Sequence, residues 1–402
     1  MNLVKKKITV LLFLVALLSF NAISQSNIEK IKANNTITPA ANLPNTYLPY
    51  LKGKKIALVT NQTGMYNEMH LVDFLLENEI TISKIFAPEH GFRGDASDGT
   101  EIKNGKDTQT GIQVISIYGK KKKPSKEDLK DVDIIVFDIQ DVGVRFYTYI
   151  SSLSYVMEAA AENNIQIIVL DRPNPNSHYI DGPILEKEYS SFVGLHEVPV
   201  VYGMTIGEYA LMVKGERWIS QSEKLDLKII PVKNYTHDSI YSLPVAPSPN
   251  LPNNESIYLY PWICYFEGAN VSIGRGTDAP FQLIGFPNFS KGDTIFTPRS
   301  IPGKSEHPPY LNKQCKGINL KKITLNELTE ANAIDWTYVW EMYSELGEKE
   351  FFIDNNYFDL LAGSKLLRKA LVEGWSIDRF KKEYQPKVDE FKKTREKYLI
   401  YD

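Results

Sequence analysis

A carboxylic acid, an imidazole and a guanidinium lie close together in the segment 86–94, FAPEHGFRG. They belong to Glu89, His90 and Arg93. Residues 80–86 alternate between apolar and polar side chains, which predicts a short strand, and the proline that follows stops regular pairing. We therefore expect the three groups on a loop at the carboxyl end of a strand, where open α/β sheets bind ligands. A positioned acid beside an imidazole suits proton transfer. The alternative is a solvated turn with a chance charge cluster.

A second polar group follows the apolar run 133–139, in the segment 138–150, DIQDVGVRFYTYI. It contains Asp141, Arg145 and Tyr147. Carboxylates beside tyrosine rings are typical of a sugar site, because rings stack on the sugar and carboxylates bind its hydroxyls. The same aspartate and arginine also suit a buried pair that joins two loops, and both interpretations stay open.

A third polar group occupies residues 265–281, YFEGANVSIGRGTDAPF. Glu267, Asn270 and Arg275 alternate there with small residues, and the glycines allow close approach of the backbone. Arg275 stands between two glycines and can present its guanidinium to a carboxylate or a phosphate. We interpret the segment as the wall of a ligand site; a β-hairpin with glycine bulges is the alternative.

Polar side chains also follow two further apolar runs. Asn61 follows one, and Asp171 and Arg172 follow another. Because the carboxyl ends of parallel strands meet at one edge of a sheet, we predict that these groups line a single cleft with those above. Asp171 and Arg172 also suit a turn that is capped by its own side chains. His196 is an isolated candidate for binding.

Alternating strand-like and helix-like segments must position these loops. The expected strands cover residues 54–60, 82–87, 113–118, 133–139 and 165–170, and the last two are apolar on both faces. The expected helices cover residues 70–78, 127–130, 153–162, 358–373 and 378–398, and another begins near Thr205. This order predicts an α/β fold with a Rossmann-like, doubly wound and mainly parallel sheet. No G-x-G-x-x-G or P-loop motif follows the first strand, which argues against a dinucleotide site.

Shifts in composition divide the chain into three parts. Residues 1–24 carry lysines, an apolar run and small residues in the order of a secretory signal peptide, so we expect an exported protein, periplasmic or extracellular. The proline-rich segment 243–253 predicts a boundary between a Rossmann-like catalytic domain at 25–250 and a smaller α+β C-terminal domain at 251–402 that completes the cleft. No later segment is apolar and long enough to cross a membrane.

The overall charge and the cysteines narrow the function further. A net charge of −3 argues against nucleic-acid binding, which needs a basic excess. Cys264 and Cys315 are the only cysteines, and no metal-ligand spacing is present. We expect two buried, free thiols and neither a metal nor a cofactor.

Several long motifs occur in the order of one known family. They are FAPEHGFRG, DIQDVGVRFYTYISSL, LDRPNP, GMTIGE, PSPNLP and FEGANVSIGRGTDAPF. Together they resemble the exo-β-N-acetylmuramidases, bacterial glycoside hydrolases that cut peptidoglycan fragments, from about Leu51 to the C-terminal end. This sequence departs from the usual motifs of the family at three positions, Tyr202, Trp262 and Ala269. The resemblance implies release of N-acetylmuramic acid from non-reducing ends, and Glu89 matches the proposed catalytic acid in the E-H-G motif.

The resemblance leads to a mechanistic hypothesis. Glu89 protonates the departing glycosidic oxygen, and His90 or a second carboxylate tunes it. Asp141 and Glu267 are both candidates for the second catalytic group, unless the 2-acetamido group of the substrate takes that role. For the lactyl carboxylate of muramic acid, Arg275 is the first candidate and Arg145 the second. A non-catalytic sugar-binding protein and a metal-dependent hydrolase remain as alternatives.

Overall fold

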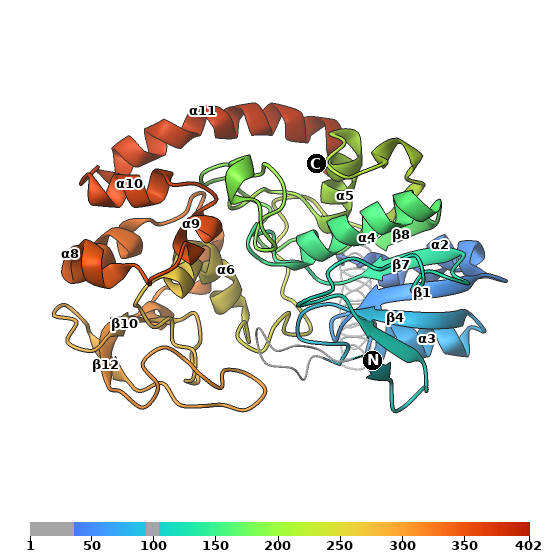
Figure 1. Cartoon of the computed structure of the whole chain (residues 1–402), viewed down its shortest axis with the longest axis horizontal. Helices are drawn as coiled ribbons and strands as arrows, with labels where there is room; N and C mark the ends of the chain where they lie inside the picture. Colours follow the sequence, from blue (N-terminus) through green and yellow to red (C-terminus); the bar gives the residue numbers. More distant parts are fainter. Residues whose placement is uncertain (1–35, 94–103) are drawn as a thin grey trace, which may run out of the picture.

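The computed structural model describes residues 36–93 and 104–402; the signal peptide expected at residues 1–24 lies outside this part of the chain. Figure 1 shows a sheet with its helices on the right and a smaller, mainly helical part on the left. In the described ranges, no helix combines the length and the apolar character that crossing a membrane requires.

The larger sheet has seven strands in the order β5-β6-β4-β1-β7-β8-β9. Its strands are β1 (Lys55–Thr60), β4 (Thr81–Ala87), β5 (Gly105–Lys106), β6 (Gln113–Ser116), β7 (Ile134–Asp138), β8 (Gln166–Leu170) and β9 (Leu227–Ile230). All neighbours are parallel except β5 and β6. From β1 the chain adds strands first on one side and then on the other, so the predicted doubly wound, mainly parallel sheet is confirmed.

Helices cover both faces of this sheet. On β1, Val59 belongs to one apolar core and Leu58 to the other, because successive side chains of a strand point to opposite faces. The covering helices are α4 (Tyr149–Asn163) and α5 (Ile206–Gly215) on the first face, and α2 (Pro44–Leu51) and α3 (Leu71–Glu77) on the second. A short hairpin, β2 (Met65–Tyr66) and β3 (Met69–His70), precedes α3.

Residues 127–130 form turns, so the short helix expected there is wrong. The carboxylate of Asp128 accepts hydrogen bonds from the backbone N–H and the hydroxyl of Ser125, and such local side-chain bonds compete with helix formation. The structure also adds the edge strand β9. Lys228 and the partial burial of β9 explain why no fully apolar run marks it in the sequence.

A small sheet and several helices make up the C-terminal part. The antiparallel strands are β10 (Leu283–Phe286), β11 (Thr294–Phe296) and β12 (Cys315–Asn319). The helices are α6 (Asn254–Ile263), α7 (Leu325–Glu330), α8 (Thr337–Phe351), α9 (Tyr357–Ala362), α10 (Leu366–Val372) and α11 (Ile377–Arg395). The single helix expected at 358–373 is thus two helices, because Gly363 ends α9 with a φ of +78°.

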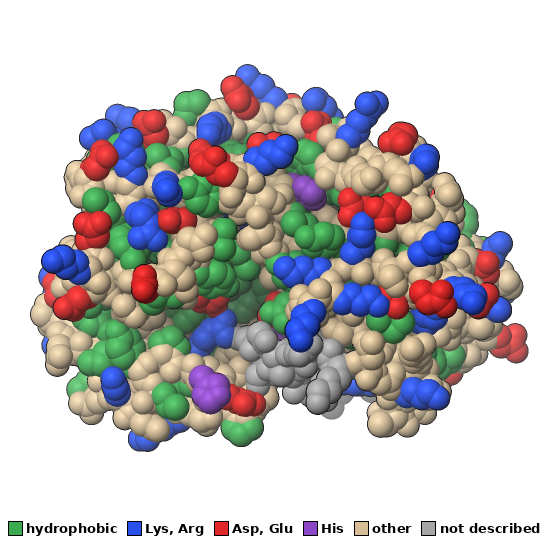
Figure 2. Space-filling view, viewed as in Figure 1, with side chains coloured by type: hydrophobic (Ala, Val, Ile, Leu, Met, Phe, Trp, Pro, Cys, Tyr) green, Lys and Arg blue, Asp and Glu red, His purple; other side chains and the backbone are tan. Residues whose placement is uncertain are grey.

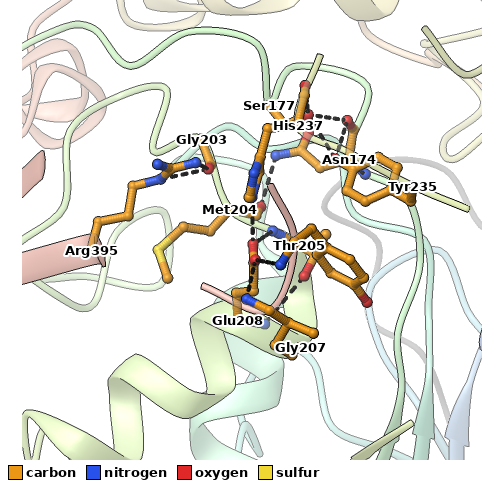
Figure 3. A network of polar contacts seen from close by, with 12 residues as sticks. Asn174, Ser177, Gly203, Met204, Thr205, Gly207, Glu208, Tyr235, His237 and Arg395 are labelled. Atoms are coloured by element: carbon orange, nitrogen blue, oxygen red, sulfur yellow. Dashed lines mark hydrogen bonds and ion pairs between the residues drawn. The ribbon is translucent and has the colours of Figure 1, made fainter. Parts of the chain in front are cut away.

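The C-terminal end of the chain is anchored on the first half. Figure 1 shows α11 running along the top toward α5. As expected, α5 begins after Thr205, which forms a capping box with Glu208. Glu208 also accepts hydrogen bonds from the backbone N–H groups of Ile400, at 2.8 Å, and Tyr401, and lies 2.9 Å from the His237 ring (Figure 3). Glu208 is therefore a structural anchor.

Both cysteines are free and buried, as the sequence predicts. Burial raises the pKa of the Cys264 thiol well above its usual value and that of Cys315 to about 11, so neither is an activated nucleophile.

Candidate active site

A pocket of about 620 Å³ is lined by loops at the carboxyl ends of the parallel strands and by segments of the C-terminal part. Figure 2 shows the hollow near the middle of one face, with basic side chains along its right edge. Its charged and imidazole groups are Glu89, His90, Lys122, Glu267 and Arg275. Its aromatic rings are Tyr118, Phe146, Tyr147, Tyr149, Phe192, Tyr260, Phe266, Phe281 and Tyr357.

Two hydroxyl groups hold the carboxylate of Glu89. Tyr118 donates to Oε1 and Thr148 donates to Oε2, each at 2.7 Å. The loop after β4 turns sharply here, because His90 and Gly91 have φ values of 68° and 81°. Tyr118 follows β6 and Thr148 precedes α4, so three separate segments position this carboxylate in the pocket.

A second carboxylate, Glu267, comes from the C-terminal part and forms an ion pair with Arg275. Burial raises the pKa of Glu267 to about 8, and the nearby charge of Glu89 adds to this shift. Burial lowers the pKa of Arg275 to about 10, so its guanidinium stays charged at neutral pH. Two carboxyl groups and one cation therefore share a partly dry site, in which a proton is readily retained.

Aromatic rings form much of the remaining wall. The centroids of Tyr147 and Tyr149 lie 4.8 Å apart, and Tyr260 lies 5.9 Å from Tyr147 and 5.0 Å from Phe281. The Tyr147 hydroxyl donates to the carbonyl of Pro247 at 2.8 Å, which fixes the ring. Rigid rings beside a few polar groups are typical of a pocket for a small, partly apolar ligand.

The structure thus brings together side chains from all three polar segments of the sequence. Glu89 and His90 come from the first, Tyr147 from the second, and Glu267 and Arg275 from the third. Of the two candidates for the second carboxylate, Glu267 lines the pocket with Glu89, whereas Asp141 does not belong to the lining.

Asp141 lies in the protein interior. Its Oδ2 accepts hydrogen bonds from the Tyr202 hydroxyl and from the backbone N–H of Gly143. Burial raises its pKa to about 6. The buried carboxylate thus holds the Tyr202 hydroxyl and the backbone of Gly143 and does not line the pocket, which corrects the expectation that Asp141 reacts directly.

Arg145 is fully buried and its guanidinium binds backbone carbonyls from both halves of the protein. Nη1 donates to the carbonyls of Pro183 and Val198, and Nη2 donates to those of Leu361 and Ala362, at 2.7 to 3.0 Å. This geometry corrects the expectation that Arg145 binds substrate. The side chain instead fastens the C-terminal part to loops of the first half of the chain.

Asp171 and Arg172 also lie in the protein interior, where they bind other side chains. Arg172 forms a buried ion pair with Asp138, with Nε 2.6 Å from Oδ1. Asp171 accepts hydrogen bonds from the hydroxyls of Thr205 and Tyr401, at 2.7 and 2.6 Å. Neither residue lines the pocket, so their predicted contact with substrate is corrected to a structural role.

Asn61 and His196 lie outside the pocket lining as well. Asn61 donates to the hydroxyl of Tyr149 at 2.8 Å and so positions a ring that does line the pocket. His196 stacks on Trp218 at 4.9 Å and lies 3.1 Å from the Ser154 hydroxyl. Burial lowers the pKa of His196 to about 4, so this ring is neutral at neutral pH.

The last two candidates bind other parts of the chain. Arg93 forms an ion pair with Asp107, at 3.1 Å. Asn270 is exposed and donates to the carbonyl of Glu350 at 2.7 Å. Neither residue belongs to the pocket lining, and a substrate contact of either stays a prediction.

Several pocket residues were not predicted from the sequence. Tyr118, Thr148, Lys122, Phe192 and Tyr357 line the pocket. Tyr118 ends an expected strand and Thr148 lies within a quoted motif, so both positions carried a usable signal. The other three come from segments without a motif. In the described part of the chain, no three His, Cys, Asp or Glu side chains are placed to hold a metal ion.

Comparison with known proteins covers almost the whole chain. Residues 56–255 match the family model "Exo-beta-N-acetylmuramidase NamZ, N-terminal", and residues 258–401 match "Exo-beta-N-acetylmuramidase NamZ, C-terminal". A relative from Bacillus subtilis (strain 168), "Peptidoglycan beta-N-acetylmuramidase NamZ", is 40% identical over 416 residues, which cover 98% of this chain and 99% of the relative.

Two solved structures from Bacteroides fragilis NCTC 9343, both DUF1343 family proteins, are similar as well. The first is 46% identical, with a TM-score of 0.84, and the match covers 91% of this chain and 99% of that one. The second is 28% identical, with a TM-score of 0.77, and the match covers 92% and 100%. The fold described above is therefore shared with these proteins.

Proposed function

The chain belongs to the NamZ family of exo-β-N-acetylmuramidases, and from this premise we propose that it releases N-acetylmuramic acid from the non-reducing ends of peptidoglycan fragments, with Glu89 as the general acid. It is an exo-acting glycosidase. The observation that carries the assignment of Glu89 is the placement of its carboxylate in the same pocket as Glu267, among aromatic rings.

The surroundings of Glu89 suit a group that gives up and regains a proton. Tyr118 and Thr148 contact it through hydroxyls, which donate to a carboxylate and can turn to accept from a carboxylic acid. Glu89 therefore keeps its partners in both protonation states. In this mechanism it protonates the glycosidic oxygen and afterwards takes a proton from water.

Glu267 is the second catalytic group in this proposal. Its carboxylate stabilises positive charge at the sugar or orients the 2-acetamido group of the substrate. The raised pKa of Glu267 supports a second candidate assignment, in which Glu267 is the proton donor and Glu89 the stabilising carboxylate. The two assignments predict opposite effects of the leaving group on the activities of the Glu89 and Glu267 variants.

Arg275 is the proposed ligand of the lactyl carboxylate. Its guanidinium lines the pocket beside Glu267 and lies 5.3 Å from the ring centroid of Phe281. A planar guanidinium matches a carboxylate through two parallel hydrogen bonds. If Arg275→Ala weakened hydrolysis of muramic acid and glucosamine glycosides equally, this role would be lost.

We place the enzyme outside the cytoplasm, in the periplasm or the extracellular space. This part of the proposal depends on the signal peptide expected at residues 1–24. Mass measurement of the mature N-terminus from fractionated cells tests it, and a cytoplasmic protein that retained residues 1–24 would contradict it.

Leaving-group dependence separates the two catalytic assignments. A glycoside with an activated aryl leaving group needs little protonation, whereas the disaccharide of N-acetylmuramic acid and N-acetylglucosamine needs an acid. Glu89→Gln is expected to lower kcat/KM on the disaccharide far more than on the aryl glycoside, and Glu267→Gln to lower both alike. The reverse pattern would transfer the acid role to Glu267. Binding without any released sugar from the wild-type protein would favour the non-catalytic alternative, and activity lost in chelator would favour the metal-dependent one.

A further inference from the structure

Lys122 and Phe192 stand together in the lining of the pocket. The Lys122 ammonium lies 4.9 Å from the ring centroid of Phe192. The Phe192 ring is held by Tyr118, at 5.7 Å, and by Tyr155, which stacks on it at 6.3 Å. A ligand can pack on a fixed, partly exposed ring of this kind and pair with the cation beside it.

The two lysines next to Lys122 in the sequence form ion pairs with acidic side chains. Lys121 pairs with Asp128, and Lys123 pairs with Glu158 and Glu162, at 2.9 Å each. These pairs fix the loop to the surface. Across residues 36–93 and 104–402 Lys122 makes no ion pair, although it is the lysine of the three that lines the pocket. Its charge is therefore available to an anionic ligand.

The position of Lys122 and Phe192 relative to Glu89 determines which part of a substrate would reach these two side chains. Tyr118 binds Oε1 of Glu89 and also contacts the Phe192 ring, so Lys122 and Phe192 approach the acid from the β6 side. Glu267 and Arg275 belong instead to the C-terminal part. With the terminal muramic acid on Arg275, a leaving group that passes Glu89 would extend toward Phe192 and Lys122.

We infer that Phe192 and Lys122 form a subsite for the leaving-group side of the substrate, in which a sugar ring packs on Phe192 and a carboxylate farther along the glycan pairs with Lys122. The inference rests on the proposed function. A muramic acid unit without a peptide stem carries a free lactyl carboxylate, so a longer fragment of this kind presents such an anion beyond the bond that is cut. The subsite would make the enzyme prefer these fragments to a neutral leaving group.

The test compares two substrates that share the same scissile bond. One is N-acetylmuramic acid linked to N-acetylglucosamine, and the other carries a further N-acetylmuramic acid at its reducing end. Lys122→Ala is expected to lower the ratio of kcat/KM for the trisaccharide over the disaccharide about fivefold, the size of a partly exposed ion pair. Lys122→Arg should keep the ratio. Lys126→Ala, which removes an exposed lysine of the same segment that is not in the lining, should leave both values unchanged.

Each outcome has a distinct meaning. A ratio that is unchanged in Lys122→Ala, with an active wild-type enzyme, would overturn the subsite and leave the proposed function standing. A wild-type protein that cleaves neither saccharide would overturn the proposed function, and the subsite with it. Phe192→Ala provides a second check, because loss of the ring should raise KM for both saccharides, and an unchanged KM would contradict the sugar contact.

Discussion

The Tyr118 hydroxyl donates a hydrogen bond of 2.7 Å to Oε1 of Glu89. This bond joins the end of β6 to the loop after β4, two strands that lie side by side in the sheet. The register of the parallel sheet therefore determines where the carboxylate of Glu89 stands. Thr148 secures the other carboxylate oxygen from the start of α4.

The first prediction concerns this bond. Tyr118→Phe removes one of the two hydroxyls that orient Glu89, and hydrogen bonds to charged groups contribute about 1.5–3 kcal/mol. We expect kcat on the disaccharide to fall about tenfold to a hundredfold, with a smaller fall on an aryl glycoside. Thr148→Val should act in the same direction. The exposed Tyr50→Phe is the matched control. Equal losses on both substrates would show that the bond does not serve proton donation.

A second prediction concerns the guanidinium of Arg145. Arg145→Met would take this donor from four buried carbonyls, of which that of Val198 keeps the backbone N–H of Leu185, and each group left unsatisfied costs about 1–3 kcal/mol. We expect the free energy of unfolding, measured in urea, to fall by at least about 3 kcal/mol, whereas the exposed Arg299→Met should change it little. Unaltered stability with a raised KM would restore the substrate-binding role.

The same contact explains the glycine at position 363. A Cβ there would lie 2.5 Å from Nη2 of Arg145, and Gly363 has a φ of +78°. Both the close contact and the backbone conformation therefore disfavour a side chain at this position. The end of α9 is thereby matched to a residue more than 200 positions earlier in the sequence.

A third prediction concerns pH. Burial and the charge of Glu89 raise the pKa of Glu267 from its ordinary value of 4.5 to about 8, so between these pH values the folded protein binds a proton that the unfolded chain has lost. The resulting stability is fully present below about pH 4.5 and is lost as the pH rises through 8. Glu267→Gln has no proton to lose, so we expect its Tm to fall less steeply than that of the wild type between pH 5 and pH 8. Parallel Tm curves would contradict the raised pKa.

The sheet could be predicted from the sequence because its central strands are apolar on both faces and each is followed by polar residues. The site could be predicted in part for the same reason. Glu89, Glu267 and Arg275 stand in segments whose glycines and polar residues are poor core material. Glu89 reaches the pocket because it follows a strand that ends at the shared edge of the sheet, whereas Glu267 and Arg275 reach it from the C-terminal part.

Several other candidates lie in the interior and not in the pocket lining, because buried structural groups use the same residue types as binding sites. Arg145, Asp171 and Arg172 have the composition of a ligand site, but their partners come from distant segments. The contact of Arg145 with Leu361 is an example, since nothing in local spacing indicates it. Conversely, Phe192 and Tyr357 reach the pocket from segments with no motif, and ordinary aromatic residues carry no signal of their own.

The most direct test of the account is the rate at which Glu89→Gln cleaves the disaccharide of N-acetylmuramic acid and N-acetylglucosamine, followed by mass spectrometry of the released sugar. Glutamine keeps the shape of the side chain but cannot donate a proton to the glycosidic oxygen. We expect kcat/KM to fall by about 10²–10⁴ with the fold and Tm preserved. Release of N-acetylmuramic acid at the wild-type rate would contradict the central claim that Glu89 is the acid.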